Sequence, residues 1–299
     1  MKLSKIIVVS DGGLANRIRP IFSAIALAEL LGLAHSDVSV YWKPSPVCDA
    51  SLTDVITTPL NEVGEDFIGG LDEEATLLYR EGSVKNAINV FKRKDIALLL
   101  ERCAPIVIDN IPSAVDCVET LSNNCTTLVI FDNQVLGLGP PLYNLYLNKI
   151  QSLLFTSEIE ETASLFISQN KLGRGSLAVH ARGTDFRVPF SYYSRKICLE
   201  DLSAPWFFAS DSRSFDRLAA KKFKNMIIRE KMSVDHSAGF LGFGESLFRS
   251  RQSIIDAAID LRILSSLNLK IFHPNSTFGL LASECGSAAI REDCRELWV

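Results

Sequence analysis

Short apolar runs that end in polar or glycine-containing turns recur along the 299-residue chain. The first run is Lys5–Ser10, and Asp11, Gly12 and Gly13 follow it at once. The next stretch, Ile21–Leu31, is apolar on nearly every face, which is typical of a helix packed on a sheet and covered on its other side. A strand, a glycine turn and a helix in this order predict half of a nucleotide-binding α/β unit.

The glycine turn does not match the dinucleotide-binding pattern. It lacks the Gly-x-Gly-x-x-Gly spacing, and no acidic residue follows where the ribose of a dinucleotide would need one. Asn16, Arg17 and Arg19 are expected to open the helix. Pro20 is expected in the first turn, where a missing N–H costs nothing. A nucleotide-linked oxidoreductase is therefore supported only by the alternation of strand and helix.

Further apolar runs in the first half predict strands at Val38–Trp42, Pro105–Asp109 and Thr127–Phe131. Together with the first strand they predict an amino-terminal α/β domain, residues 1–150. The segment Asn61–Glu81 is polar and acidic, and we expect it to be irregular surface.

The second half predicts another α/β domain, residues 151–299, which follows a break in the pattern at Gly137–Pro141. Helical spacing at Leu142–Phe155 and Ile159–Ser168 predicts two helices that bridge to it. Its strands and helices are expected to alternate, and a glycine-rich loop at Asp235–Gly244 is expected to line a cleft. The strands are predicted at Leu177–Val179, Trp206–Ala209, Asn225–Arg229 and Leu269–Phe272, and helices at Arg213–Lys222 and Ser253–Leu267.

Three of these predicted strands end in polar clusters: His180–Asp185, Ser210–Ser212 and Asn275–Thr277. An apolar run without polar alternation, such as Leu177–Val179, suits a parallel strand that is covered on both faces. In a parallel sheet all three clusters open on one edge, where α/β proteins bind ligands. The second domain is therefore predicted to hold a ligand site.

Arg182 is the leading candidate in that site, because its planar guanidinium can bind a phosphate with two hydrogen bonds and keeps its charge. The alternative is a simple pair with Asp185 at the strand end. Ser276 and Thr277 lie at the amino terminus of a predicted helix. Their hydroxyls and the free backbone N–H groups of the first helical turn favour phosphate binding. Their alternative role is an ordinary N-cap.

Three aspartates have two interpretations each. Asp211 can accept hydrogen bonds from a base edge with adjacent N–H and NH₂ donors, as in guanine, or can cap the helix that follows. Asp256 and Asp260 lie one turn apart on one helix face, where organising a loop is favoured over an acid/base pair. His180 has no serine or cysteine partner at a suggestive position, so a triad hydrolase is unsupported.

Composition excludes several partners. The formal charge is -4 and the basic residues are dispersed, so no nucleic-acid-binding stripe is predicted. No stretch approaches the roughly 18 apolar residues that a membrane helix needs, and the first apolar run is too short for a secretory signal. We expect a soluble, cytoplasmic protein with no membrane span.

Neither disulfides nor a metal are expected. The seven cysteines are an odd set without a Cys-x-x-Cys pair, and we expect them to be reduced and mostly structural. No His/Asp cluster has metal-ligand spacing, and the chain has no Asp-x-Asp motif for a divalent ion.

Four motifs, in the correct order and spacing, resemble those of the GDP-fucose-dependent fucosyltransferases of the α1,2, α1,6 and protein O-fucosyl superfamily. They are GGLANR (Gly12–Arg17), VHARGTDF (Val179–Phe186), FFASDS (Phe207–Ser212) and the stretch from Asp256 through Ile271 to NSTFGLLAS (Asn275–Ser283). The order of the four is more specific than any one of them.

The resemblance implies a GT-B-like architecture of two Rossmann-type domains facing across a cleft. It implies inverting, metal-independent transfer of fucose from GDP-fucose, held by the carboxyl-terminal half, to a glycan hydroxyl, held mainly by the amino-terminal half. No cofactor is expected beyond the donor substrate. The residues expected to bind substrate are Gly12, Gly13, Arg17, His180, Asp185, Asp211, Ser212, Asn275, Ser276, Thr277 and Phe278.

The catalytic roles are hypotheses that build on this implied reaction and on where the residues lie in the sequence. Arg182, with Ser276 and Thr277, is expected to stabilise charge on the leaving β-phosphate. Asp11 is the candidate general base for the acceptor hydroxyl; its alternative role is to bond the backbone of its own turn. Asn16 is expected to contact the sugar. The competing functions are a transferase that uses another nucleotide sugar and a non-catalytic nucleotide-sugar or carbohydrate-binding protein.

Overall fold

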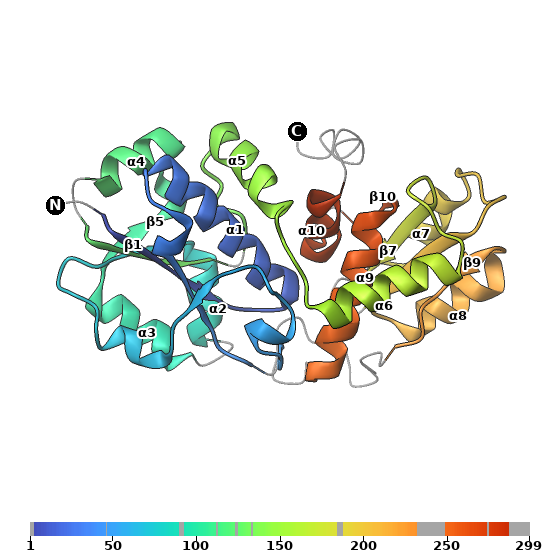
Figure 1. Cartoon of the computed structure of the whole chain (residues 1–299), viewed down its shortest axis with the longest axis horizontal. Helices are drawn as coiled ribbons and strands as arrows, with labels where there is room; N and C mark the ends of the chain where they lie inside the picture. The colour runs from blue at the N-terminus through green and yellow to red at the C-terminus, as the bar shows by residue number, and fades with distance from the viewer. Residues whose placement is uncertain are drawn as a thin grey trace. The chain divides into compact units, whose positions relative to one another are not determined.

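The computed structural model describes residues 3–286 except 46, 90–92, 112, 123–124, 133, 184–187, 232–248 and 274. The chain forms two compact units, coloured along the sequence in Figure 1. The first comprises Met1–Ser45 and Thr57–Leu153, and the second comprises Pro46–Ile56 and Leu154–Val299. The short segment Pro46–Ile56 belongs to the second unit, although the sequence analysis included it in the amino-terminal domain.

The first unit is built on a six-stranded sheet in the order β3-β2-β1-β6-β4-β5. All its paired strands are parallel, so their carboxyl ends share one edge. The strands predicted at Lys5–Ser10, Val38–Trp42, Pro105–Asp109 and Thr127–Phe131 are confirmed as β1, β2, β5 and β6. The bounds are β1 Lys5–Ser10, β2 Val38–Trp42, β3 Asn61–Glu62, β4 Thr76–Tyr79, β5 Ala104–Val107 and β6 Thr127–Phe131.

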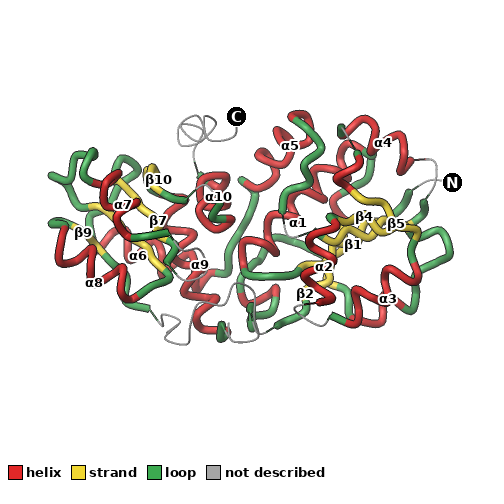
Figure 2. Tube along the Cα trace, turned by 180° about the vertical axis from the view of Figure 1, so that it is seen from behind, coloured by secondary structure: helices red, strands yellow, loops and turns green. Residues whose placement is uncertain are grey.

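Helices cover both faces of this sheet, as a fully buried parallel sheet requires. In Figures 1 and 2, α1 and α5 lie above the strands and α2 and α3 below them. Residues such as Val9, Leu77 and Val129 form the core on the α2 and α3 side. The bounds are α1 Leu14–Leu30, α2 Glu81–Asn89, α3 Lys94–Arg102, α4 Ala114–Ser122 and α5 Pro140–Ile150.

The expectation of irregular surface at Asn61–Glu81 is wrong. This segment contains β3, a 3₁₀ turn at Glu65–Ile68 and β4, which lies between β6 and β5 in the sheet. Leu77 and Leu78 have no exposed surface. The strand is only four residues long and follows acidic residues 72–74, so the average polarity of the segment concealed it.

The expected place of Pro20 in the first helical turn is also wrong. Helix α1 begins at Leu14, with Gly13 as its N-cap, so the proline lies inside the helix. Pro20 supplies no N–H to the carbonyl of Asn16, a loss that costs about 3 kcal/mol in an ordinary helix. Burial of nearly the whole helix between the sheet and α5 offsets this cost.

The second unit is built on a four-stranded parallel sheet in the order β10-β7-β8-β9. The strand and helix alternation predicted for this half is confirmed. The bounds are β7 Leu177–Ala181, β8 Trp206–Ser210, β9 Met226–Ile227, β10 Asn268–Ile271, α6 Ser157–Gln169, α7 Phe190–Ile197, α8 Arg213–Lys222, α9 Arg251–Ser266 and α10 Thr277–Cys285.

The two faces of this sheet have different partners. Val179 and Phe208 pack with Tyr193 of α7 and Ala219 of α8 in one core cluster. The intervening residues of β7 point to the opposite face, since side chains alternate along a strand. That face packs on α9, so His180 lies on the α9 side.

The cysteines in the described part of the chain are free thiols. Burial raises the pKa of Cys103 to about 11 and that of Cys117 to about 12, so both stay protonated and unreactive at neutral pH. Cys294 and the predicted loop at Asp235–Gly244 lie outside the described residues. Over the ranges that can be described, no helix is long and apolar enough to span a bilayer.

Candidate functional site

The parallel sheet of the second unit brings the three predicted polar clusters together. Strands β10, β7 and β8 are neighbours, and each cluster follows one of them. The Nδ1 atom of His180 lies 3.5 Å from Oγ of Ser276, and its ring centroid lies 4.8 Å from that of Phe278. The N–H of Gly183 donates to Oδ1 of Asp211 at 2.7 Å. The juxtaposition expected from the sequence is therefore present.

Gly183 is needed because β7 and the start of α8 approach closely. A Cβ atom at this position would lie 2.9 Å from the Cβ of Ser212 and 2.9 Å from the ring of Phe215. With no side chain there, the backbone N–H reaches the carboxylate of Asp211. Ser212 is the N-cap residue of α8, and its hydroxyl shares a 2.8 Å hydrogen bond with that of Ser214.

The backbone of Arg182 is held on both sides by one buried tyrosine. Its N–H donates to the hydroxyl of Tyr193 at 3.0 Å, and that hydroxyl donates to the carbonyl of Arg182 at 3.2 Å. Burial raises the pKa of Tyr193 to about 12, so the hydroxyl keeps its proton. The guanidinium therefore projects from a fixed point of the chain, and its side chain is half-buried.

Ser276 is the N-cap of α10, and its Oγ accepts from the N–H of Gly279 at 3.2 Å. The N-cap interpretation is confirmed, and Ser276 has no exposed surface with which to reach a ligand. Thr277 and Phe278 are half-buried and Asn275 is exposed. Of the four residues expected to bind substrate here, Asn275, Thr277 and Phe278 therefore have exposed surface and Ser276 does not.

His180 is a neutral imidazole at physiological pH. Its pKa is lowered to about 4, chiefly by burial; Asp211 opposes this shift, and the neighbouring cations Arg182 and Lys231 add to it. A neutral ring has one donor and one acceptor nitrogen. It can therefore hold a hydrogen bond to a ligand or to Ser276 without adding charge.

We expect His180 to make the protein less stable as the pH falls from 6.5 to 4. In that range the unfolded chain binds a proton here and the folded chain does not, which corresponds to about 3 kcal/mol over the full shift to a pKa of about 4. Urea unfolding at pH 7 and pH 4.5 of wild type and His180→Asn measures this loss. Equal pH dependence of the two proteins would contradict it.

Asp216, in the same unit, has the opposite effect on the stability of the folded protein as the pH falls. Burial raises the pKa of Asp216 to about 6, so this carboxyl favours the folded state as the pH falls through 6. Asp216 is present in both proteins of that comparison. Their difference therefore isolates His180.

Asp256 and Asp260 hold the chain that follows β9, so the loop-organising interpretation is confirmed. Nη1 of Arg229 donates to Asp256 and Nε to Asp260, both at 2.8 Å. Nζ of Lys231 donates to Asp260 at 2.5 Å. The sequence analysis missed the role of both cations; their signal is a basic residue at the end of the predicted strand Asn225–Arg229 and a second one two residues later.

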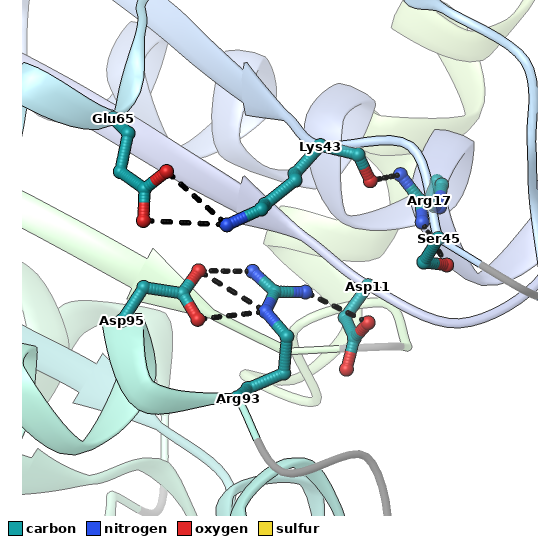
Figure 3. Close-up of polar contacts among 7 residues, drawn as sticks. All are labelled: Asp11, Arg17, Lys43, Ser45, Glu65, Arg93 and Asp95. Carbon is teal, nitrogen blue, oxygen red and sulfur yellow. Dashed lines mark hydrogen bonds and ion pairs between the residues drawn. The ribbon is translucent and has the colours of Figure 1, made fainter. Parts of the chain in front are cut away.

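Asp11 is buried at the end of β1 and pairs with a cation from far along the chain. Nη1 of Arg93 donates to Oδ1 of Asp11 at 3.0 Å, and the same guanidinium binds Asp95 through Nε and Nη2. Figure 3 shows Arg93 between the two carboxylates. Near them, Lys43 pairs with Glu65 at 3.2 Å. The sequence analysis missed Arg93, which belongs to no motif.

Arg17 has no exposed surface and serves the loop after β2. Its guanidinium donates to the carbonyl of Gly12 at 2.9 Å. It also donates to the carbonyl of Lys43 at 2.7 Å and to Oγ of Ser45 at 2.8 Å (Figure 3). It also stacks on the ring of Trp42, 5.0 Å from the centroid. These contacts hold the loop after β2, and the substrate contact expected of Arg17 stays a prediction.

The glycine turn is shaped around Asn16. Gly12 has φ +78°, a conformation that favours glycine, and a Cβ there would lie 3.1 Å from Nδ2 of Asn16. Gly13 is the N-cap of α1. Oδ1 of Asn16 is buried without a hydrogen-bond partner among the described residues.

Two expectations are not tested by this geometry. Asp185 lies outside the described residues, so its pairing with Arg182 stays a prediction. Within the ranges that the structure describes, no three His, Cys, Asp or Glu side chains form a group that could hold a metal ion. The expected absence of a metal requirement stays a prediction.

Comparison with solved structures gives consistent matches along the chain. The Bradyrhizobium alpha-1,6-fucosyltransferase NodZ, soaked with GDP-fucose, aligns with a TM-score of 0.59 at 15% identity over 95% of this chain and 93% of that chain. POFUT1 in complex with GDP-fucose aligns with a TM-score of 0.52 at 12% identity over 94% of each chain. The chain has the fucosyltransferase fold.

A plant fucosyltransferase structure also matches the fold of this chain. A mutant of Arabidopsis thaliana FUT1 in complex with GDP aligns with a TM-score of 0.51 at 13% identity, over 95% of this chain and 69% of that one. No family model and no curated protein matches the sequence. The α/β class with parallel sheets and the resemblance to fucosyltransferases, both predicted from the sequence, are confirmed at the level of the fold.

Proposed function

We propose that this protein is a glycosyltransferase that moves fucose from GDP-fucose to a hydroxyl of a glycan or glycoconjugate, with inversion and without a metal ion. The observation that supports it best is the approach of His180 to Ser276, which joins two of the four motifs at one sheet edge. Further support is the fold shared over nearly the whole chain with a fucosyltransferase that was co-crystallized with GDP and soaked with GDP-fucose.

The donor diphosphate would bind where β7 and β10 end. Arg182 supplies a permanent positive charge there, and the first turn of α10 supplies N–H groups and the positive end of a helix dipole. As the bond to fucose breaks, negative charge grows on the β-phosphate. These donors would stabilise that charge most in the transition state, which is what accelerates the reaction.

The base of the nucleotide would be recognised on the β8 side. A carboxylate can accept from both N1–H and the 2-amino group of guanine, and Asp211 is the candidate for that role. Its Oδ1 already accepts from Gly183, which fixes the orientation of the carboxylate. His180, neutral and buried beside it, offers a further uncharged hydrogen-bonding group.

The acceptor hydroxyl would be handled by the glycine turn of the first unit. Asn16 is proposed to contact the sugar and Asp11 to remove the proton from the hydroxyl. Arg93 holds Asp11 in one orientation through the 3.0 Å ion pair. The roles proposed for this turn rest on the motif resemblance and on the burial of its carboxylate.

Turnover of GDP-fucose tests the proposal. The protein is incubated with GDP-fucose and a panel of glycan acceptors in the presence of EDTA, and mass spectrometry follows fucosylated product and free GDP. We expect GDP release with product formation. Binding of GDP-fucose without release or transfer would identify a binding protein instead, and turnover of a UDP-sugar in its place would identify another transferase.

Asp11→Asn tests the proposed base. General-base catalysis contributes about 10² to 10⁴ in rate, so we expect kcat to fall in that range and the acid limb of the pH–rate profile to disappear. Asp95→Asn is the matched control, because it removes the other carboxylate bound to Arg93 and leaves Asp11 in place. An unchanged pH–rate profile in Asp11→Asn would rule out Asp11 as the general base.

A further inference from the structure

Lys231 follows β9, the strand farthest from β10 in the sheet that is proposed to bind the donor. None of the four motifs includes a residue there. Strand β8 pairs with β9 so that Trp206 faces Met226 and Phe207 faces Ile227. Because β8 and β9 run parallel, Asp211, directly after β8, and Lys231, four residues after β9, both follow the carboxyl ends of their strands. Lysine 231 therefore lies at the carboxyl edge, beside the candidate base-binding residue.

The ammonium of Lys231 is fixed and still has donors to spare. Its Nζ donates to Oδ2 of Asp260 at 2.5 Å, and Arg229 binds the other oxygen of that carboxylate. Among the described residues this is its only hydrogen bond, and an ammonium has three donors. The side chain is 12% exposed. Within the part of the chain that the structure describes, one or two of its N–H groups thus have no acceptor.

The position of Lys231 favours the base over the phosphates. Neighbouring strands lie about 4.8 Å apart, so β9 is about 14 Å from β10, whose following helix offers the phosphate-binding N–H groups. A nucleotide extends from its phosphates through the ribose to the base. A diphosphate at β10 and β7 therefore directs the base toward β8 and β9.

We propose that Lys231 is a specificity-determining residue that donates a hydrogen bond to the 6-oxo group of the donor's purine. This inference rests on the proposed function and on Asp211 as the acceptor for the opposite part of the same base edge. Guanine has an acceptor at its 6-position and adenine has a donor there. An ammonium at this point would favour 6-oxopurines and disfavour adenine.

Binding of GDP and 6-thio-GDP, measured by calorimetry, tests this role. Sulfur accepts hydrogen bonds weakly, so wild type should bind GDP about 10- to 100-fold more tightly than 6-thio-GDP, the size of one hydrogen bond to a charged group. In Lys231→Met the two ligands should bind equally. Lys231→Arg retains donors and should retain a preference for GDP.

The controls separate specificity from folding and from the proposed function. Lys224→Met replaces an exposed lysine before the opposite end of β9 and should leave the preference unchanged. Asp260 keeps Arg229 as a partner in Lys231→Met, so the charge stays paired. Equal weakening of both ligands, or no change, would overturn the assignment. Failure of wild type to bind GDP would instead overturn the proposed function.

Discussion

Arg182→Ala is expected to keep the fold and lose nearly all transfer. Each donor that stabilises developing anionic charge is worth about 10² to 10³ in rate, and without a metal the guanidinium would carry much of that stabilisation. The backbone at this point is held by Tyr193 through main-chain atoms, so the substitution leaves the local structure in place. Initial rates with GDP-fucose, with circular dichroism as the check on folding, measure the loss.

The matched control for this loss is Arg174→Ala. Arg174 is exposed and precedes β7 at its amino end, at the opposite edge of the sheet from Arg182. It should keep wild-type kcat and KM. A well-folded Arg182→Ala protein with undiminished transfer would remove the central assignment of the donor site.

Arg17→Ala is expected to destabilise the protein by about 3–5 kcal/mol, a large part of the stability of a typical domain. The substitution leaves the carbonyls of Gly12 and Lys43 without the donors that now satisfy them, and removes the stacking on Trp42. Buried acceptors that lose their partners cost the full desolvation penalty. Urea unfolding followed by tryptophan fluorescence, to which Trp42 contributes, measures the change.

Two further variants define what Arg17 contributes. Arg17→Lys keeps the charge but cannot reproduce three hydrogen bonds with the geometry of a guanidinium, so an intermediate loss is expected. Arg102→Ala removes an arginine with one 3.3 Å hydrogen bond, to the carbonyl of Ile68, and should change the unfolding free energy by less than about 1 kcal/mol. A midpoint for Arg17→Ala equal to that of wild type would contradict the structural role.

The elements that the sequence predicts well are those with continuous apolar runs. Strands β1 and β7 are buried on both faces, and their composition alone identifies them. Strand β4 is equally buried, but four residues beside an acidic segment give no period to detect. Helix α1 was predicted, but its start was placed too late, because Pro20 is usually found in a first turn.

In the candidate site, too, the sequence predicts some contacts and not others. The approach of His180 to Ser276 was predictable, because polar residues after parallel strands share an edge. The pairs Arg93–Asp11 and Lys231–Asp260 join residues far apart in sequence, and which strands are neighbours decides them. The burial of Arg17 and its contacts with the loop after β2 were not predicted, because a motif conveys residue identity but not burial. Contacts that depend on sheet order therefore needed the structure.

Calorimetric titration of the wild-type protein with GDP, UDP and CDP, in the presence of EDTA, tests the central claim most directly. The donor site at the edge of β10, β7 and β8 predicts that GDP binds at least about tenfold more tightly than either pyrimidine diphosphate, a difference of one good hydrogen bond to the base. Equal binding of the three nucleotides, a preference for UDP or CDP, or no binding of GDP would contradict it.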